Sequence, residues 1–115
     1  MNILYHNPRC SKSRQTLALL EEHNASFEVV EYLNETPSPL ALQDIVNKLG
    51  FSSAHQLIRT KEALYKELNV VSCKDDSKEL LDLLSKNPKL IERPIFVTAK
   101  KAAIGRPPES VLALL

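Results

Sequence analysis

The sequence lacks the features of a secreted, membrane-bound or nucleic-acid-binding protein. It has only two cysteines, Cys10 and Cys73, which is too few for a disulfide-rich secreted scaffold, so a reducing cytoplasm is the expected compartment. The formal net charge of +1 gives no general attraction to nucleic acid or to an anionic membrane. No apolar run is long enough to span a bilayer, and we expect no signal peptide because the N-terminus has no charged segment followed by an apolar one.

What the chain does contain is typical of a soluble globular domain. Its 115 residues are enough for one hydrophobic core and few for two, so we expect a single domain over residues 1–115. Hydrophobic residues make up 43% and charged residues 25%, which are ordinary proportions. Since the overall charge is nearly balanced, any recognition of an anion must be local.

One basic stretch, residues 5–14, stands out as the candidate site. An apolar run at 3–5 precedes it and an amphipathic helical pattern at 16–22 follows, which predicts a strand, a tight loop and a helix. Cys10 then lies at or just before the first helical turn. The N–H groups of a first turn have no partners within the helix and carry partial positive charge, so such a cysteine can reach a pKa of roughly 3.5–7.5.

The charges of this loop favour a nucleophile that faces an anion. First turns normally prefer Asp or Glu, yet this one carries Arg9, Lys12 and Arg14 and no acid. The alternative is a buried structural cysteine among solvated charges. We favour the nucleophile, because a polar and basic loop is a poor place to bury a thiol.

Arginine is scarce, but four of the five arginines lie beside Cys10 or directly before a proline. Two of the five arginines flank Cys10, and two more, Arg93 and Arg106, directly precede prolines. The planar guanidinium binds a tetrahedral oxyanion through paired hydrogen bonds, which an ammonium group cannot do. Chance could produce this distribution, but it also fits an oxyanion site.

The remaining pattern predicts an α/β domain in the order β-α-β, helical insertion, β-β-α. A strand at 27–33, buried on at least one face, should run parallel to the first strand through a right-handed crossover. Residues 94–98 and 102–104 predict a hairpin. A last short helix at 109–115 should bury Leu112, Leu114 and Leu115.

The insertion between these two parts reads as helical. Ser38 should cap a helix that ends at Gly50. Its apolar face should consist of Leu40, Ile45, Val46 and Leu49. Shorter helical segments follow at 53–57 and 61–68. The last helix of the insertion should begin at a capping pair of Asp76 and Glu79.

Four ordered motifs, at residues 6–14, 57–59, 92–95 and 105–107, resemble those of the glutaredoxin-linked, ArsC-like arsenate reductases. The small bacterial arsenate-reductase-like proteins are the nearest branch, and the resemblance covers nearly the whole chain. It implies a thioredoxin-like fold, with a four-stranded mixed sheet, a helical insertion and a cis peptide bond before Pro94.

The resemblance also implies roles for individual residues. The family's nucleophile maps onto Cys10, and the histidine thought to acidify it maps onto His6. The family's three oxyanion-binding arginines map onto Arg59, Arg93 and Arg106. Three further residues are expected to favour the thiolate: Arg9, Ser13 and Arg14.

The implied activity is reduction of arsenate to arsenite through one cysteine thiolate, with glutathione as co-substrate and glutaredoxin as partner. No metal and no bound organic cofactor are expected, in agreement with the lack of any Cys/His cluster with ligand spacing. Position 13 is serine, so the loop has one thiol rather than the pair of a Cys-x-x-Cys motif. Cys73 is the only other candidate resolving thiol, and we interpret it as non-catalytic.

Two alternatives remain open from the sequence. The first is a monothiol oxidoreductase of the same fold with little activity on arsenate. The second is a redox regulator that binds RNA polymerase. Ser13 removes the cysteine pair that such regulators commonly use, and the arginine triad would then have no evident role.

Overall fold

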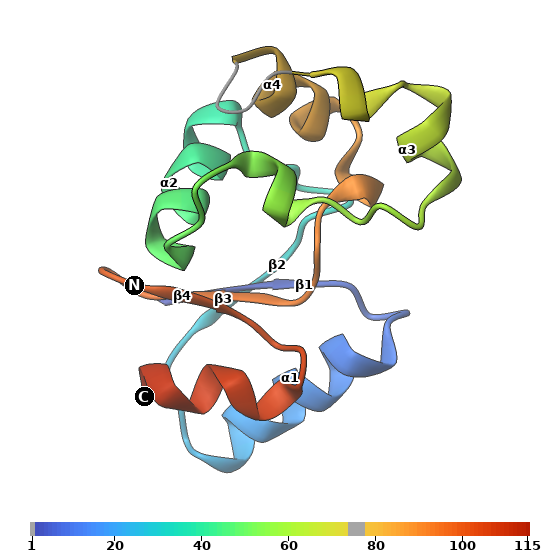
Figure 1. Cartoon of the computed structure of the whole chain (residues 1–115). Coiled ribbons are helices and arrows are strands. Elements are labelled where there is room, and N and C mark those ends of the chain that lie inside the picture. The colour runs from blue at the N-terminus through green and yellow to red at the C-terminus, as the bar shows by residue number, and fades with distance from the viewer. Residues whose placement is uncertain (1, 74–77) are drawn as a thin grey trace. The chain divides into compact units, whose positions relative to one another are not determined.

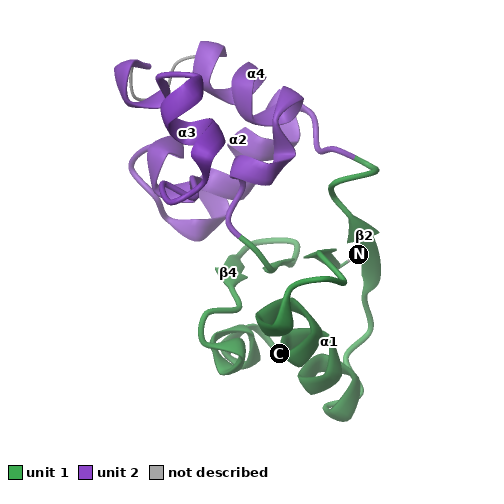
Figure 2. Cartoon of the chain, turned by 90° about the vertical axis from the view of Figure 1, so that its right-hand side faces the viewer, with its two compact units in different colours: residues 1–35, 93–115 green, residues 36–92 purple. Residues whose placement is uncertain are grey.

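The computed structural model describes residues 2–73 and 78–115. The chain divides into two compact units, and Figure 2 colours residues 1–35 and 93–115, which form unit 1, green and residues 36–92, which form unit 2, purple. The division falls at the two ends of the predicted helical insertion. The expectation of one domain over the whole chain stays a prediction. None of the helices in the described ranges is both long and apolar enough to cross a membrane.

Unit 1 is built on a four-stranded mixed sheet with the strand order β2-β1-β3-β4. The first two strands are parallel, whereas β3 is antiparallel to both β1 and β4. This confirms the thioredoxin-like α/β fold with its β-α-β and β-β-α parts. The elements are β1 (Ile3–His6), α1 (Ser11–Glu22), β2 (Glu28–Glu31), β3 (Ile95–Val97), β4 (Ala102–Ile104) and the 3-10 helix η4 (Pro108–Leu114).

The core of unit 1 lies between the sheet and the pair of helices α1 and η4, which pack together on one of its faces (Figure 1). Leu4, Leu20, Phe96 and Val111 form a cluster there in which every side chain is fully buried. Each such burial contributes about 1.5–3 kcal/mol relative to an exposed side chain. The cluster ties α1 to β1, and thereby determines where the loop between them lies.

The strand β2 differs from the expectation of a buried face. Glu28 and Glu31 are exposed and Val29 is 42% exposed. The reason is the position of β2 at the edge of the sheet, where only one neighbour covers it. The residues on either side of β2 are more buried: Phe27 is partly buried and packs edge-on against Phe96, and Tyr32 is only 1% exposed.

The final helix also differs from its prediction. It is a 3-10 helix that buries Val111, whereas Leu115 is 54% exposed and Leu112 and Leu114 are only partly buried. A 3-10 helix has three residues per turn rather than 3.6, so a different set of side chains shares its inner face.

Unit 2 is helical within the described residues. Its elements are α2 (Pro39–Leu49), the 3-10 helix η1 (Ala54–Leu57), α3 (Ala63–Glu67), the 3-10 helix η2 (Val70–Ser72), α4 (Lys78–Lys86) and the 3-10 helix η3 (Pro88–Leu90). The capping pair predicted at the start of α4 includes Asp76, which lies outside the described residues.

The limits of α2 follow the sequence. The Ser38 hydroxyl accepts a hydrogen bond from the Ala41 backbone N–H at 3.1 Å, and Gly50 ends the helix with a φ of 75°. Leu40, however, is 84% exposed and the buried positions are Leu42, Ile45 and Val46. At about 100° per residue, position 40 lies on the opposite side of the helix from these three, so its inclusion in the apolar face was wrong.

Candidate active site

The ends of all four strands of unit 1 meet at one edge of the sheet. His6 is paired with Glu31, so the chain leaves the parallel strands β1 and β2 at the same level. Tyr5 is paired with Ile95, and Ile95 with Ile104, so the chain enters β3 and leaves β4 at that level too. The register therefore brings the loop after β1, the residue after β2, the residues before β3 and those after β4 together.

Cys10 is the residue that caps the N-terminus of α1. Its backbone is extended, with φ of −93° and ψ of 124°, and its N–H donates to the Asn7 carbonyl at 3.0 Å to close the loop. The thiol makes no capping hydrogen bond, and the first turn contains no acidic residue. The sulfur therefore lies at the positive end of a helix without a local carboxylate to offset that charge.

Hydrogen-bond donors and positive charge converge on this sulfur. Arg106 Nη2 donates to Cys10 Sγ at 3.6 Å. Burial, the largest influence, raises the pKa of Cys10, but the Ser13 and Lys12 backbone amides and the Arg93 guanidinium together lower it below its ordinary value. The net effect favours the thiolate.

Cys10 is more buried than the sequence suggested, with only 8% of its surface exposed. The expectation that a basic loop would not bury the thiol was wrong, because residues from distant parts of the chain cover it. The burial is of a kind that suits a reactive sulfur. A structural thiol packs against apolar atoms, whereas this one faces amides and guanidinium groups.

The arginines Arg93 and Arg106 are held next to each other by the end of the hairpin. Arg106 Nε donates to the Arg93 carbonyl at 2.8 Å, and the Gly105 N–H donates to the Pro94 carbonyl at 2.9 Å. The Arg93–Pro94 peptide bond is cis, and so is the bond between Arg106 and Pro107. The Arg93 Nε atom is buried and has no hydrogen-bond partner among the described residues. An unpaired buried donor of this kind is suited to an anionic ligand.

His6 acts on the loop rather than directly on the sulfur. Its Nδ1 lies 2.7 Å from the Ser13 hydroxyl, which also accepts a hydrogen bond from the Asn7 N–H at 3.0 Å. Burial lowers the pKa of His6, and the Arg14 charge lowers it further against the opposing influence of Glu31. A ring kept neutral adds no positive charge at neutral pH. Its contribution to thiol acidity would pass through Ser13, whose amide faces Cys10.

The two arginines that flank Cys10 in sequence are directed elsewhere. Arg14 Nη1 donates to the Pro8 carbonyl at 2.9 Å, and Arg9 is exposed. Neither guanidinium is among the groups that most lower the pKa of Cys10. Their predicted support of the thiolate stays a prediction.

Arg59 belongs to unit 2. Its backbone N–H donates to the Leu90 carbonyl at 2.7 Å, which holds the residue beside the segment that leads to Glu92. Its Nε and Nη1 atoms are buried without a hydrogen-bond partner in the part of the chain that the structure describes, and Nε lies 3.9 Å from a Glu62 carboxylate oxygen. Its predicted role in oxyanion binding stays a prediction, and these two donors are available for it.

Tyr32 lies at this edge too, although no pattern in the sequence marks it as a site residue. The Cys10, Arg93 and Arg106 charges all act on its phenol, as does the Asn7 amide. In the sequence it appeared only as an aromatic residue of a strand. The available signal was its position, directly after the end of β2 and level with the start of the Cys10 loop.

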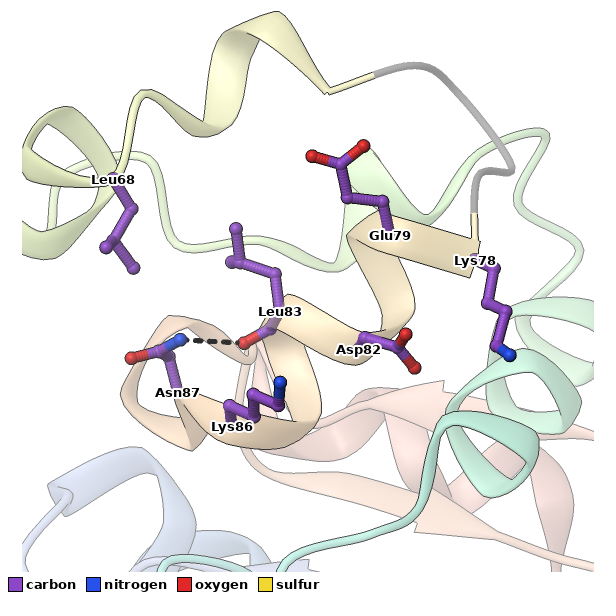
Figure 3. A pocket seen from close by; sticks show the side chains of 7 residues that line it. All are labelled: Leu68, Lys78, Glu79, Asp82, Leu83, Lys86 and Asn87. Atoms are coloured by element: carbon purple, nitrogen blue, oxygen red, sulfur yellow. Dashed lines mark hydrogen bonds between the residues drawn. The ribbon is translucent and has the colours of Figure 1, made fainter.

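Two hollows accompany these features. One, of about 350 Å³, lies in unit 1 beside the Cys10 loop and includes His6, Arg9 and Glu31 in its lining. The other, of about 490 Å³, lies in unit 2 along α4 and is lined by Leu68, Leu83 and solvent-facing charges such as Lys78 and Glu79 (Figure 3). The second hollow contains neither a thiol nor a guanidinium group, so its size does not make it the reactive site.

Comparisons with known proteins show to which family the chain belongs. The model of the ArsC family matches residues 5–114. An arsenate reductase of Neisseria meningitidis serogroup B is 48% identical over 112 residues, which are 97% of this chain and 96% of that protein. The uncharacterized protein YfgD of Escherichia coli K12 is 53% identical over 113 residues, covering 97% and 94%. The solved structure of an arsenate reductase from Vibrio cholerae is 45% identical and superposes with a TM-score of 0.93, covering 99% and 97%.

Proposed function

The chain belongs to the ArsC family, and on this basis we propose that it is a cytoplasmic enzyme that reduces arsenate to arsenite. The Cys10 thiolate is the nucleophile, glutathione is the co-substrate and glutaredoxin is the protein partner. The observation that carries the proposal is the Arg106 Nη2 atom 3.6 Å from Cys10 Sγ, with Arg93 acting on the same sulfur. A thiolate beside two guanidinium groups is equipped both to hold an oxyanion and to attack it.

The arginines bind the substrate in this proposal. Arsenate is a tetrahedral oxyanion, and Arg93 and Arg106 present donors to it from the end of the hairpin. Arg59 provides the third guanidinium, which is supported by its buried Nε and Nη1 atoms, neither of which has a hydrogen-bond partner among the described residues. Because such donors are fixed before the substrate arrives, little reorganisation accompanies the attack.

The chemistry then proceeds in balanced steps. The Cys10 sulfur attacks arsenic, one As–O bond breaks and the oxygen leaves as water. Glutathione displaces a second oxygen in the same way. A glutaredoxin thiol next attacks the glutathione sulfur, which forms a mixed disulfide and leaves As(III) on Cys10. Water then hydrolyses the As–S bond, which releases arsenite and restores the Cys10 thiol. Over the whole sequence, the glutathione and glutaredoxin sulfurs lose the two electrons that arsenic gains.

The decisive test is a coupled assay with arsenate, glutathione, glutaredoxin, glutathione reductase and NADPH. We expect arsenate-dependent oxidation of NADPH by the parent protein and none by Cys10→Ser. Cys73→Ser is the matched control, because it removes the other thiol and should leave the rate unchanged. Loss of activity in Cys73→Ser would replace the single-thiol mechanism with an internal dithiol mechanism.

The same assay separates the alternatives. Glutathione mixed disulfides, offered in place of arsenate, would be the better substrates of a monothiol oxidoreductase. Stoichiometric capture of RNA polymerase without turnover of either substrate would identify a regulator instead. Each of these outcomes would overturn arsenate reduction as the function.

A further inference from the structure

The Tyr32 hydroxyl is a buried polar group without a hydrogen-bond partner among the described residues. The residue is only 1% exposed, so bulk solvent does not reach the hydroxyl. Buried hydroxyl groups are nearly always hydrogen-bonded in folded proteins, and an exception needs an explanation. A group left unpaired in the free protein is often one that a ligand pairs.

The position of Tyr32 indicates which ligand. It follows Glu31, the register partner of His6, so it leaves the sheet at the edge where the Cys10 loop begins. Arg93 and Arg106 lie at the same edge, on either side of the β3–β4 hairpin. A second unpaired donor, Arg93 Nε, is also buried there.

The state of the phenol is suited to donation. Burial raises the pKa of Tyr32, although Arg93, the Asn7 amide and Arg106 lower it in part. The hydroxyl therefore keeps its proton at neutral pH. The Asn7 amide lies on the donor side of the phenol oxygen, but this contact does not meet hydrogen-bond geometry. Even if it did, the phenolic proton would still have no acceptor.

We propose that Tyr32 is a further substrate-binding residue, whose buried hydroxyl donates a hydrogen bond to an oxygen of the tetrahedral oxyanion held at Cys10 by Arg93 and Arg106. The inference rests on the proposed function and adds a residue to its site. A phenol contributes a directed donor without further charge, which complements guanidinium groups that already supply the charge.

The inference is tested by Tyr32→Phe, which deletes one oxygen atom and keeps the ring. Arsenate binding is measured by calorimetry in the Cys10→Ser background, so that no turnover is needed. We expect the Kd to rise about tenfold, as for the loss of one hydrogen bond to a charged group. Tyr65→Phe, which removes a phenolic hydroxyl from α3 in unit 2, is the matched control and should leave the Kd unchanged.

Thermal unfolding distinguishes binding from a structural role. A hydroxyl that serves the ligand is unpaired in the free protein, so its removal should leave the Tm equal or higher. A hydroxyl that serves the fold would give the reverse, a lower Tm with an unchanged Kd, and that result overturns the inference. In the active protein, Tyr32→Phe should raise the KM for arsenate and leave the KM for glutathione unaltered.

The outcomes also separate this inference from the proposed function. If the parent reduces arsenate and Tyr32→Phe binds it equally well, the inference fails and the function stands. If Cys10→Ser binds arsenate and loses affinity with Tyr32→Phe, but the parent shows no turnover, the function fails and the inference stands. If Cys10→Ser does not bind arsenate and the parent does not reduce it, both are overturned.

Discussion

At Cys10, opposing physical effects meet on a single sulfur atom. Removal from water favours the neutral thiol, whereas the amides of Ser13 and Lys12 and the charge of Arg93 favour the thiolate. The pKa is lowered on balance because these groups come from two segments at once, the first turn of α1 and the chain just before β3, while Arg106, after β4, donates a hydrogen bond to the same sulfur. The reactivity of Cys10 is therefore set by several surrounding residues and not by the cysteine alone.

His6 illustrates how a titratable group can serve by remaining neutral. Its pKa is lowered from 6.5 by burial, so the folded protein binds fewer protons than the unfolded chain just below pH 6.5. The stability that this contributes is complete above that pH and is lost as the pH falls through the folded-state pKa.

We therefore predict that the Tm of the parent falls on acidification below about pH 6.5, and that His6→Asn shows a flatter dependence in that window. At neutral pH the variant should retain part of the contact with Ser13. Scanning calorimetry across this range measures both effects. His23→Asn, which changes the exposed histidine that follows α1, is the control for a histidine substitution away from the site. Equal slopes for parent and His6→Asn would contradict the assignment.

At the scale of elements, the chain just after β4 passes very close to α1 at Gly105. A Cβ atom added at Gly105 would collide with the Thr16 hydroxyl and lie 2.8 Å from Pro94 Cγ. Thr16 is itself fully buried and donates to the Lys12 carbonyl at 2.8 Å. Only glycine allows the end of β4 to come this close, and Arg106 is the next residue along the chain.

We predict that Gly105→Ala destabilises the protein by about 1–3 kcal/mol, the usual range for inserting atoms into a packed interior. Urea denaturation gives the free energy of unfolding, and the alkylation rate of Cys10 should fall because Arg106 is displaced. Adding Thr16→Ala removes the colliding hydroxyl, so the double variant should regain part of the loss. Strict additivity of the two changes would show that they do not share this contact.

For the whole molecule, the two units are expected to contribute different properties. The described groups that most lower the pKa of Cys10, the Ser13 and Lys12 amides and the Arg93 guanidinium, lie in unit 1, as does Arg106, which donates to the sulfur. Unit 2 contains Arg59, whose buried Nε and Nη1 atoms have no hydrogen-bond partner in the part of the chain that the structure describes. Acidity of the thiol and affinity for the oxyanion should then be separable by mutation.

We predict that Arg106→Ala slows alkylation of Cys10 at neutral pH and also weakens arsenate binding, by about 1.5–3 kcal/mol for a charged hydrogen bond. Arg59→Ala should weaken binding by a similar amount while leaving the alkylation rate against pH unchanged. Iodoacetamide kinetics and calorimetry measure the two properties independently. A shift of the Cys10 pKa in Arg59→Ala would contradict this division, as would full arsenate affinity in that variant.

Sequence alone was sufficient where the governing physics is local. The position of Cys10 at the start of α1 follows from an apolar run, a polar loop and a helical pattern within a few residues of each other. Likewise Ser38 and Gly50 limit α2 through the capping hydrogen bond and the left-handed backbone that their types favour. These features depend on residues that are neighbours in the chain, so the amino-acid sequence is enough to predict them.

Only the tertiary structure decided what depends on contacts between distant segments. The exposure of β2 follows from its place at the sheet edge, and the burial of Cys10 from the residues that surround it. The resemblance had assigned Arg93 and Arg106 to the Cys10 site, but the strand register is what brings them and Tyr32 to the same end of the sheet. Register is set by how the whole sheet packs its core, so no local pattern specifies it.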